Sequence, residues 1–341
     1  MRVEPPLDRA ALLASLLGTH GLALDALAFI PQGMAAAYRA QGPSGTFFVK
    51  VFPGTPTGRE LAARLPAETG LLRALRERGV LGNVPEVVPA LDGAPTARFG
   101  TLPLVVQRFI PGRTLNAEIG PQLPRLAETL GRLHAGTPRL AGLPLPFPPE
   151  DLAFPWEGQL LADLAGLDAI GPGGGFGPNG LKALLGPRRP ELLVVLARAR
   201  ELRGRALRAG GTPVVCHTDA HGWNLILDPA GKLWLIDWET ARLAPPEHDL
   251  WAFGARLPEV LPAYAAARGA PAVPNADRLG FYLYRRHLED IAAWVAQLLR
   301  DPVGDEQHAA DLEMLERHGL GGWARLPREL EALRAAARTL A

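Results

Sequence analysis

The stretch "VVCHTDAHGWNLILDPAGKLWLIDWE", Val214 to Glu239, places two histidines, three aspartates and an asparagine between apolar runs. From Leu225 it reads as an apolar run, a turn with proline and glycine, and a second apolar run, which is typical of a β-hairpin. If the turn centres near Ala230, the numbers of paired residues sum to about 461. Asn224, at the start of one strand, is then predicted to face Asp237, at the end of the other.

Facing residues on paired strands lie about 5 Å apart. An amide oxygen and a carboxylate at that separation suit Mg²⁺, which takes one or two protein oxygens together with phosphates and water. Asp219 precedes Asn224 in a tight loop, so it is predicted to approach the same point and to accept a proton from a substrate hydroxyl. A loop aspartate, an asparagine and an aspartate after a hairpin form half of the phosphoryl-transfer machinery of kinase-like folds.

The other half of that machinery is a strand lysine paired with a helix glutamate. The segment "FIPQGMAAAYRAQGPSGTFFVKVF", residues 29–52, reads as three strands separated by two turns, with Lys50 on the third strand. After Pro66, Glu68 shares a helix face with Leu71, Leu72 and Leu75, so it points inward and needs a cation. Taken singly, Lys50 also fits a solvated strand residue and Glu68 a helix-capping acid.

Composition allows a two-domain globular protein. The chain has 341 residues, 48% hydrophobic and 21% charged, with 36 Lys and Arg against 35 Asp and Glu. A net charge of +1 provides no field for nucleic acid or an anionic membrane, so we expect neither partner and predict a small-molecule ligand. The single cysteine, Cys216, is expected to be a buried, inert thiol. Together with the lack of a signal or membrane-spanning pattern, it favours a cytoplasmic location.

We predict an α+β, two-lobed protein-kinase-like fold, with a small antiparallel-sheet N-lobe and a larger, mainly helical C-lobe. The strand in "TLPLVVQRFIPG" ends at Pro111 and Gly112, and helical patterns follow. The predicted lobes are therefore residues 1–107 and 114–341, joined by a hinge at 108–113. We also expect a first helix capped by Asp8, a long helix from Leu279 to Leu299, and a mobile surface loop at the glycine-rich segment Gly171 to Gly180.

The motifs "CHTDAHGWNLIL" and "LWLIDWETARLAPPEHDLW" resemble those of the aminoglycoside phosphotransferase family, and "LAPPEHDLW" is especially similar to its spectinomycin phosphotransferase branch. Lys50, Glu68, "IPG" and "LGRLH" fall where the family's lysine, glutamate, hinge and helix motifs would fall. The resemblance implies a kinase that uses ATP and Mg²⁺, with antibiotic resistance as a biological role.

The resemblance also implies a role for each matching position. Asp219 would be the catalytic base and His217 would orient its loop, while Asp249 would hold the loop backbone. Asn224 and Asp237 would bind Mg²⁺. The nucleotide would contact Lys50, supported by Glu68, and the backbone of Arg108 and Ile110. Gly33 is the single glycine of the turn over the phosphates, where protein kinases have several.

A cationic acceptor such as an aminoglycoside or aminocyclitol needs carboxylates. Acids outnumber basic residues between His217 and Leu250, and Glu239 belongs to this group. Because several of these acids already have roles, we expect further acceptor contacts on the late helix, from Glu289, Asp290 and Trp294. The alternative for Glu289 and Asp290 is pairing with Arg285 and Arg286 on a solvated helix face.

Three other functions fit parts of the pattern. His217, His221 and Asp219 could bind zinc in a metallohydrolase, although a further ligand is missing and Asn224 and Asp237 would be unexplained. The acceptor could be another hydroxylated metabolite, such as an amino alcohol, homoserine or a sugar amine. The chain could also bind a nucleotide with little turnover.

Overall fold

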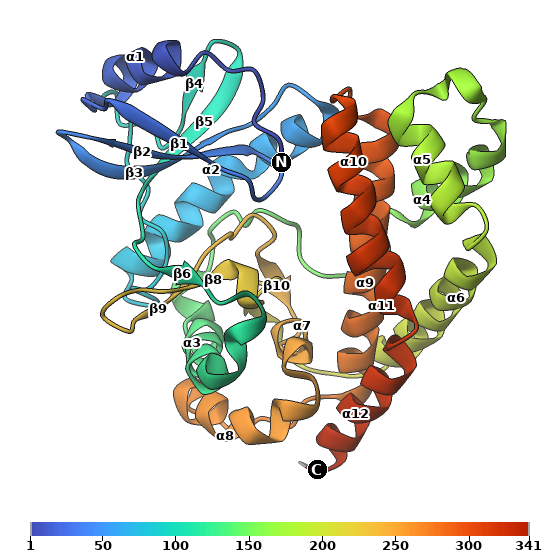
Figure 1. Cartoon of the computed structure of the whole chain (residues 1–341). Coiled ribbons are helices and arrows are strands. Elements are labelled where there is room, and N and C mark those ends of the chain that lie inside the picture. Colours follow the sequence, from blue (N-terminus) through green and yellow to red (C-terminus); the bar gives the residue numbers. More distant parts are fainter. Residues whose placement is uncertain (1, 340–341) are drawn as a thin grey trace. The chain divides into compact units, whose positions relative to one another are not determined.

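The structure is a computed structural model that describes residues 2–339 (Figure 1). The chain forms two compact units, each built from segments that are distant in sequence. The first unit comprises Met1–Pro149, Val214–Ala244 and Ala263–Ala270, and the second comprises Glu150–Pro213, Pro245–Pro262 and Pro271–Ala341. The hinge expected at residues 108–113 falls inside the first unit, and the division into two lobes there stays a prediction.

A five-stranded antiparallel sheet belongs to the first unit, with strand order β1-β2-β3-β5-β4. Its strands are β1 (Ala26–Ile30), β2 (Ala36–Gly42), β3 (Gly45–Val51), β4 (Ala97–Phe99) and β5 (Leu102–Arg108). Tyr38 and Val49 of the sheet pack in one buried cluster with Leu12 of α1 (Arg9–His20). The side chain of Asp8 accepts a hydrogen bond from Ala11 N, which confirms the predicted cap. The three predicted strands of residues 29–52 are present as β1 to β3.

The helix α2 (Pro56–Glu77) starts earlier than the sequence pattern indicates, and Pro66 lies inside it. Proline has no backbone N–H, so it removes one hydrogen bond from the helix. The turns before it are nevertheless fixed by burial, because Leu61 and Leu65 pack with Phe52 in a second cluster. Tertiary packing therefore outweighs the local preference of proline for a helix start.

The other elements of the first unit are short, apart from one helix, α3. They are β6 (Arg113–Thr114), η1 (Asn116–Gln122), α3 (Leu123–Ala135), η2 (Thr137–Leu140), β7 (Val214–Cys216), η5 (Gly222–Asn224), β8 (Leu225–Leu227), β9 (Leu233–Leu235) and β10 (Arg242–Ala244). Strands β6-β8-β9 form one small sheet and β10-β7 another. The predicted hairpin is present as β8 and β9, and Cys216, at the end of β7, is fully buried.

The second unit is helical. Its elements are α4 (Glu157–Gly166), η3 (Leu167–Ala169), η4 (Pro172–Gly174), α5 (Phe176–Leu185), α6 (Arg189–Ala206), α7 (Glu247–Leu250), η6 (Trp251–Arg256), α9 (Ala276–Arg300), α10 (Asp305–Met314), η7 (Leu315–Leu320), α11 (Gly321–Trp323) and α12 (Leu326–Arg338). The helix α8 (Leu257–Arg268) starts in the second unit and ends in the first. The long helix predicted for residues 279–299 is α9, which packs against α6 and α12.

The glycine-rich segment of residues 171–180 is exposed over residues 171–176, as its composition predicts, but it is not an irregular loop throughout. A short 3₁₀ turn, η4, and the first half of α5 occupy it. A Cβ atom on Gly177 would come within 2.8 Å of the His308 ring, and one on Gly180 within 2.4 Å of Leu312. The glycines therefore let α5 lie close against α10, which is a packing role that composition alone does not reveal.

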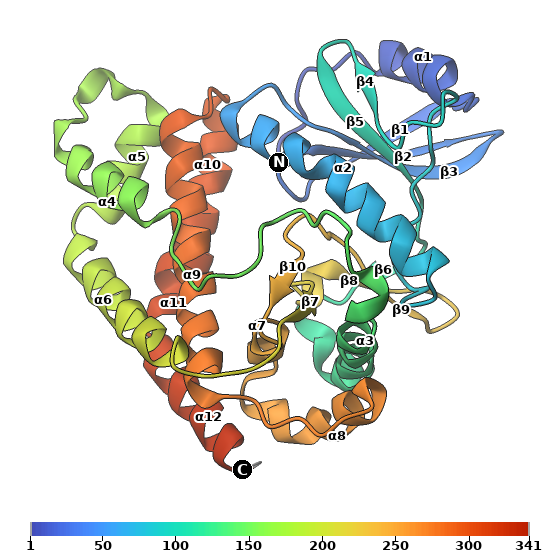
Figure 2. The same ribbon diagram turned by 180° about the vertical axis from the view of Figure 1, so that it is seen from behind.

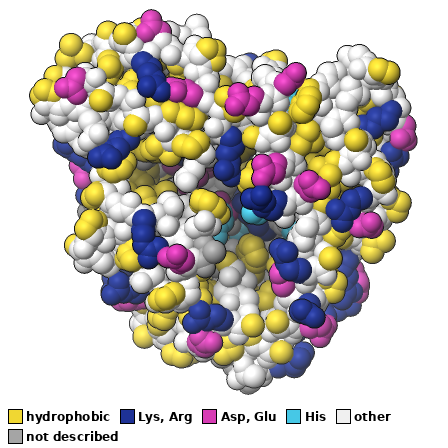
Figure 3. Space-filling view, in the orientation of Figure 1, with side chains coloured by type: hydrophobic (Ala, Val, Ile, Leu, Met, Phe, Trp, Pro, Cys, Tyr) yellow, Lys and Arg dark blue, Asp and Glu magenta, His cyan; other side chains and the backbone are white. Residues whose placement is uncertain are grey.

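Basic and acidic side chains are interspersed on the face drawn in Figure 3, in keeping with the net charge of +1. Across residues 2–339, no helix combines the length and the apolar character that are needed to cross a membrane.

Candidate active site

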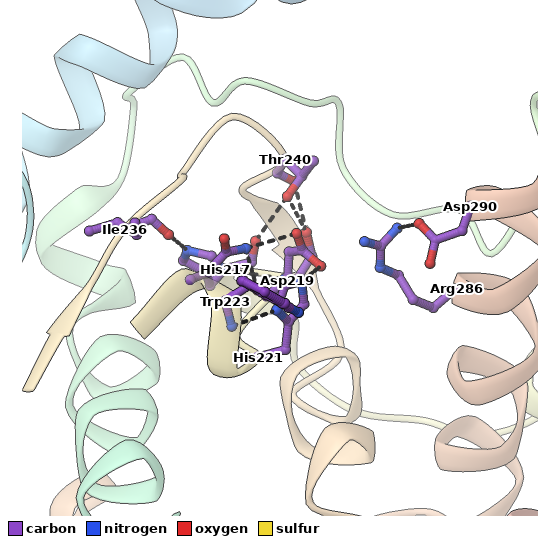
Figure 4. A network of polar contacts seen from close by, with 10 residues as sticks. His217, Asp219, His221, Trp223, Ile236, Thr240, Arg286 and Asp290 are labelled. Carbon is purple, nitrogen blue, oxygen red and sulfur yellow. Dashed lines mark hydrogen bonds and ion pairs between the residues drawn. The ribbon is translucent and has the colours of Figure 1, made fainter. Parts of the chain in front are cut away.

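The loop after β7 is organised by the buried side chain of His217 (Figure 4). Its Nε2 lies 2.9 Å from the carbonyl oxygen of Ile236, and its Nδ1 accepts a hydrogen bond from Asp219 N at 3.2 Å. A carbonyl needs a donor and an N–H needs an acceptor, so these contacts require the neutral ring with its proton on Nε2. The edge of the Trp238 ring packs against His217 at a centroid distance of 4.7 Å. His217 therefore orients the loop that carries Asp219, and its engaged nitrogens do not favour the zinc alternative.

Asp219 and Asn224 are joined directly. The Asn224 Nδ2 donates to the carbonyl oxygen and to the Oδ2 of Asp219, both at 2.9 Å. The other carboxylate oxygen, Oδ1, lies 3.2 Å from His221 Nε2. The amide orientation that serves Asp219 turns the Asn224 Oδ1, an oxygen of the kind that hard cations prefer, away from these contacts.

A close backbone approach fixes the same loop at Gly222. A Cβ atom there would lie 1.8 Å from the carbonyl oxygen of Asn116, far inside any tolerated contact. Asn116 itself has a positive φ of 48°. Only glycine lets the two backbone segments meet. Sequence reasoning gave Gly222 no role, although its place between His221 and Asn224 was a signal for a tight turn.

The register of the hairpin corrects the predicted facing pair. Leu225 pairs with Leu235 and Leu227 with Leu233, so paired numbers sum to 460 rather than about 461. Asn224 continues this ladder opposite Ile236, whose N–H donates to the Asn224 carbonyl at 2.9 Å. Asp237 lies one residue beyond the register position of Asn224, and the two do not face each other in the sheet.

A change of backbone conformation redirects Asp237. Its φ is +66°, in the left-handed region that few residues other than glycine, asparagine and aspartate adopt. From there its Oδ1 forms an ion pair with Lys50 Nζ at 2.7 Å. The side chains are 19% exposed for Lys50 and 30% for Asp237, so the pair is partly shielded from water. The structure thus brings the strand lysine and the hairpin aspartate together within the first unit.

Glu68 and Glu239 complete a carboxylate cluster around Lys50. Burial raises the pKa of Glu68 to about 7, with Lys50 opposing the rise and Asp237 adding to it. Burial and then Asp237 raise the pKa of Glu239, and Lys50 opposes this rise. Burial alone would lower the pKa of Lys50, but Asp237, Glu239 and Glu68 outweigh it and raise that pKa. Three carboxyl groups therefore share one ammonium, with Asp237 as its direct partner and Glu68 acting through its charge.

A hydroxyl contact that was not predicted from the sequence joins Thr218, after β7, to Thr240, before β10. Thr218, with a φ of 73°, donates from Oγ1 to the Thr240 carbonyl at 3.1 Å and lies 2.9 Å from Thr240 Oγ1. The Thr240 hydroxyl in turn donates to the His217 carbonyl at 3.3 Å. No short motif marks Thr240, because its role depends on the strand pairing of β7 with β10.

The residues expected to bind adenine lie at the end of β5. The Arg108 N–H donates to the Glu86 carbonyl at 2.8 Å, so a backbone contact from Arg108 to a base would use its carbonyl oxygen. Ile110 lies two residues further on, outside the strand. Gly33 lies in the turn between β1 and β2 with a φ of +73°, and a Cβ there would meet nothing within 4 Å. Its glycine is thus required by conformation, not by crowding.

The expected acceptor residues of the late helix lie on α9, in the second unit. Asp290 forms an ion pair with Arg286, one turn earlier, at 2.5 Å (Figure 4). Arg285 is buried and forms an ion pair with Glu150 at 2.6 Å, and Glu289 acts on it through its charge. The pairing of these acids with neighbouring arginines, which was the alternative prediction, is thus present for Asp290 as an ion pair. Asp249 is buried in α7 of the same unit, and its role towards the loop backbone stays a prediction.

The model of the phosphotransferase enzyme family (APH) matches residues 27–282 of the 341. The chain belongs to this family. It is accordingly a phosphotransferase, a small-molecule kinase, and the expected recognition and reaction class are confirmed. A comparison with curated proteins gives no match.

Solved structures share the fold at low identity. Spectinomycin phosphotransferase in complex with ADP and spectinomycin has a TM-score of 0.70 and 16% identity, covering 97% of this chain and 99% of that one. A microcompartment-associated aminopropanol kinase has a TM-score of 0.63 and 18% identity, covering 95% and 98%. Choline kinase from Streptococcus pneumoniae has a TM-score of 0.56 and 17% identity, also covering 95% and 98%. At these identities the likeness shows the fold, which is the predicted α+β kinase-like one.

Proposed function

We propose that the protein transfers the γ-phosphoryl group of ATP to a hydroxyl of a small, amine-bearing molecule. The observation that carries this proposal is the Lys50–Asp237 ion pair in the same unit as the Asp219–Asn224 contact. A cation-binding carboxylate, a phosphate-binding ammonium and a base are the groups that phosphoryl transfer needs.

The residues around Lys50 fit a divalent cation. Glu68, Asp237 and Glu239 place three carboxyl groups against one ammonium, and the pKa of Glu68 and of Glu239 is raised. Such an excess of acids is relieved when a hard cation binds, and Asp237 and Asn224 are the residues that would hold it. When bound, Mg²⁺ and ATP supply the neutralised, transferable phosphoryl group.

Asp219 is the proposed general base. The loop holds its carboxylate by the Asn224 amide and aligns its backbone by His217. In this role an Asp219 oxygen takes the proton of the acceptor hydroxyl while that hydroxyl oxygen bonds to the γ-phosphorus and the bond to the β,γ-bridging oxygen breaks. His217 is a positioning residue, because both of its ring nitrogens contact backbone groups.

Nucleotide binding is assigned to the end of β5 and to β3. We propose that the Arg108 carbonyl and the Ile110 backbone pair with adenine, that Lys50 exchanges Asp237 for the phosphates, and that the Gly33 turn covers them. Because ATP is the donor, we place the reaction in the cytoplasm. We propose that the N-lobe of residues 1–107 binds the nucleotide and that the C-lobe of residues 114–341 binds the acceptor, with the hinge at 108–113 between them.

The first acceptor candidate is an aminoglycoside or aminocyclitol such as spectinomycin, which would make the protein an antibiotic-resistance enzyme. Its support is the fold likeness to spectinomycin phosphotransferase, together with the motif "LAPPEHDLW". Carboxylates for its amines are proposed to come from Glu239, Glu289 and Asp290, with Trp294 lining the pocket.

A second candidate acceptor is a small amino alcohol. The aminopropanol kinase and the choline kinase have the same fold over nearly the full chain, which supports this class. The two candidates share a cationic nitrogen in a molecule that carries a hydroxyl, so the proposed chemistry at Asp219 is the same.

The test is product formation from ATP and Mg²⁺ with a panel of spectinomycin, other aminoglycosides, aminopropanol and choline. A phosphorylated product, identified by mass, is expected from at least one amine. Asp228→Asn, in the hairpin turn, serves as the matched control for Asp219→Asn. Nucleotide binding without any acceptor-dependent turnover across the panel would instead support a nucleotide-binding protein with little turnover.

A further inference from the structure

A hollow lies on the first unit and is lined by residues other than those assigned to catalysis. It has a volume of about 420 Å³ and is lined by the loop after α2, by one face of α3 and by the turn between β8 and β9. The two views agree that this turn lies beside α3 and the C-terminal end of α2 (Figures 1 and 2). Ligand pockets commonly have volumes of about 300 to 1,000 Å³, so the hollow has room for a small molecule.

Positive charge dominates the lining. Arg125, Arg132 and Lys232 contribute cations, and Glu128 is the acid among the lining residues. Arg132 forms an ion pair with Glu128, so these two charges offset each other. Arg125 and Lys232 are the remaining cations.

Backbone carbonyls hold these two cations. Arg125 Nη1 donates to the Gly231 carbonyl at 2.7 Å, and Lys232 Nζ donates to the Gly82 carbonyl at 3.0 Å. A carbonyl is neutral, so it orients the cation without cancelling its charge. An ammonium has three N–H donors and a guanidinium five, so each cation keeps donors for a ligand.

The neighbouring groups make Lys232 rigid. Its Nζ lies 4.0 Å from the centroid of the Trp234 ring, a cation–π contact. The nearby carboxylate of Asp228 feels the charge of Lys232, but its oxygens accept from Trp234 Nε1 at 2.9 Å and from the Lys232 backbone at 2.8 Å. The Trp234 ring and the Gly82 carbonyl thus fix the position of the Lys232 ammonium.

We propose that this hollow binds a small phosphate-bearing anion, through Arg125 and Lys232. A planar guanidinium and a compact ammonium are the side chains that recognise phosphate oxygens. The ligand would bridge α3 and the hairpin turn, which Asn83 already links by donating to the Leu233 carbonyl at 2.8 Å. Inorganic phosphate and a phosphate ester share this chemistry.

The indole N–H of Trp234 offers a local readout, because its ring lies beneath Lys232. The experiment is a titration of ¹⁵N-labelled full-length protein with inorganic phosphate, with glycerol phosphate, and with sodium chloride at matched ionic strength. The Trp234 indole signal is assigned from its loss in Trp234→Phe. Wild-type protein is expected to show a saturable shift of this signal with at least one phosphate compound and none with chloride.

The double variant Arg125→Gln with Lys232→Gln should weaken the response. Loss of one charge-assisted hydrogen bond weakens binding by about tenfold or more, so the double variant should not saturate. Arg208→Gln is the matched control, because Arg208 is a surface arginine that also donates to a backbone carbonyl, that of Gly204, at 2.7 Å. It should bind as wild type does.

Three results would overturn the proposal: an unshifted Trp234 signal with both phosphate compounds, an equal shift with chloride, or an undiminished shift in the double variant. Arg125 and Lys232 are exposed, so their replacement leaves the core unchanged, and the remaining indole signals report any misfolding directly. If the double variant is perturbed, the single variant Lys232→Gln gives the same comparison. A response to glycerol phosphate alone would assign the ester, and a response to both would assign the phosphate group.

Discussion

Lys50 on β3 and Asp237 beyond β9 form an ion pair with Nζ and Oδ1 2.7 Å apart, although 187 residues separate them in sequence. The Lys50 ammonium is bound to the Asp237 carboxylate, which we assign to Mg²⁺ binding. Loading of nucleotide and Mg²⁺ should therefore shift Lys50 from Asp237 to the phosphates, with Glu68 and Glu239 keeping its charge stabilised.

Replacing Lys50 by Ala should raise the nucleotide KM and lower kcat, because the phosphates lose their ammonium. Lys50→Arg should restore activity only in part, since a planar guanidinium does not reproduce the geometry of an ammonium. Steady-state kinetics with varied ATP measure both effects. Unchanged parameters in Lys50→Ala would mean that the lysine serves only the local ion pair.

Asp237→Asn should abolish the magnesium dependence of nucleotide binding more completely than Asn224→Ala, because a carboxylate holds the cation by charge and an amide by its dipole. Asparagine is the appropriate replacement, since it tolerates the positive φ at this position. Calorimetric titration of nucleotide with and without Mg²⁺ tests the difference. The assignment fails if Asp237→Asn keeps the wild-type magnesium dependence.

Asp219→Asn should lower kcat by about 100-fold to 10,000-fold, the usual contribution of a general base, while nucleotide affinity stays near that of wild type. Turnover and nucleotide Kd are measured separately, with Asp228→Asn as the control carboxylate. Retention of more than half of the turnover would remove Asp219 from the base role.

The raised pKa of Glu68, about 7, predicts a pH dependence of stability. Between the unfolded value near 4.5 and the folded value, the folded state binds more protons, so the free energy of unfolding falls as the pH rises through this window. The loss is complete once the pH exceeds the folded value of about 7, and it amounts to at most about 3.5 kcal/mol. The free energy of unfolding of wild type should therefore fall from pH 5 to pH 7.5, while that of Glu68→Gln should not show this fall. The difference between variant and wild type should thus shift in favour of the variant as the pH rises.

Thermal unfolding of both proteins at those two pH values, without nucleotide or Mg²⁺, measures this effect. Glu68→Asp is a useful companion variant, because it keeps a titrating carboxyl at the same position. The same difference between wild type and Glu68→Gln at both pH values would contradict the prediction.

Asp290→Asn should raise the acceptor KM and leave the nucleotide KM unchanged, if its carboxylate binds an acceptor amine. Its ion pair with Arg286 already offsets part of the charge, so the expected effect is smaller than for an unpaired acid. Glu259→Gln, which breaks a surface pair with Arg256, is the control. An acceptor KM equal to that of wild type would assign Asp290 to helix stabilisation.

The sequence predicted the elements that depend on short-range patterns. The strands of residues 29–52, the Asp8 cap and the hairpin follow from alternation, capping and turn chemistry, and all are present. The placement of Lys50 on a strand and of Glu68 on an inward helix face also follows from local patterns. Both are confirmed, since Lys50 lies on β3 and the Glu68 side chain is only 5% exposed.

Features that depend on tertiary contacts could not be predicted in this way. The hairpin register differs by one residue, and the positive φ of Asp237 is what turns its side chain towards Lys50. The packing of Leu61 and Leu65 extends α2 through Pro66. Residue spacing does not reveal these effects, because they arise from segments that meet only in the folded chain.

The first unit is assembled from three separate stretches of chain, and this has a consequence for its synthesis. Lys50 and Glu68 leave the ribosome long before residues 214–244. At about 5 to 20 residues per second, the 187 residues between Lys50 and Asp237 take about 10 to 40 s to translate. For that interval the nascent chain carries an ammonium and a carboxyl group that are destined for the interior without the strand that will enclose them. Translation speed and chaperone access in this window should therefore affect the yield of active protein.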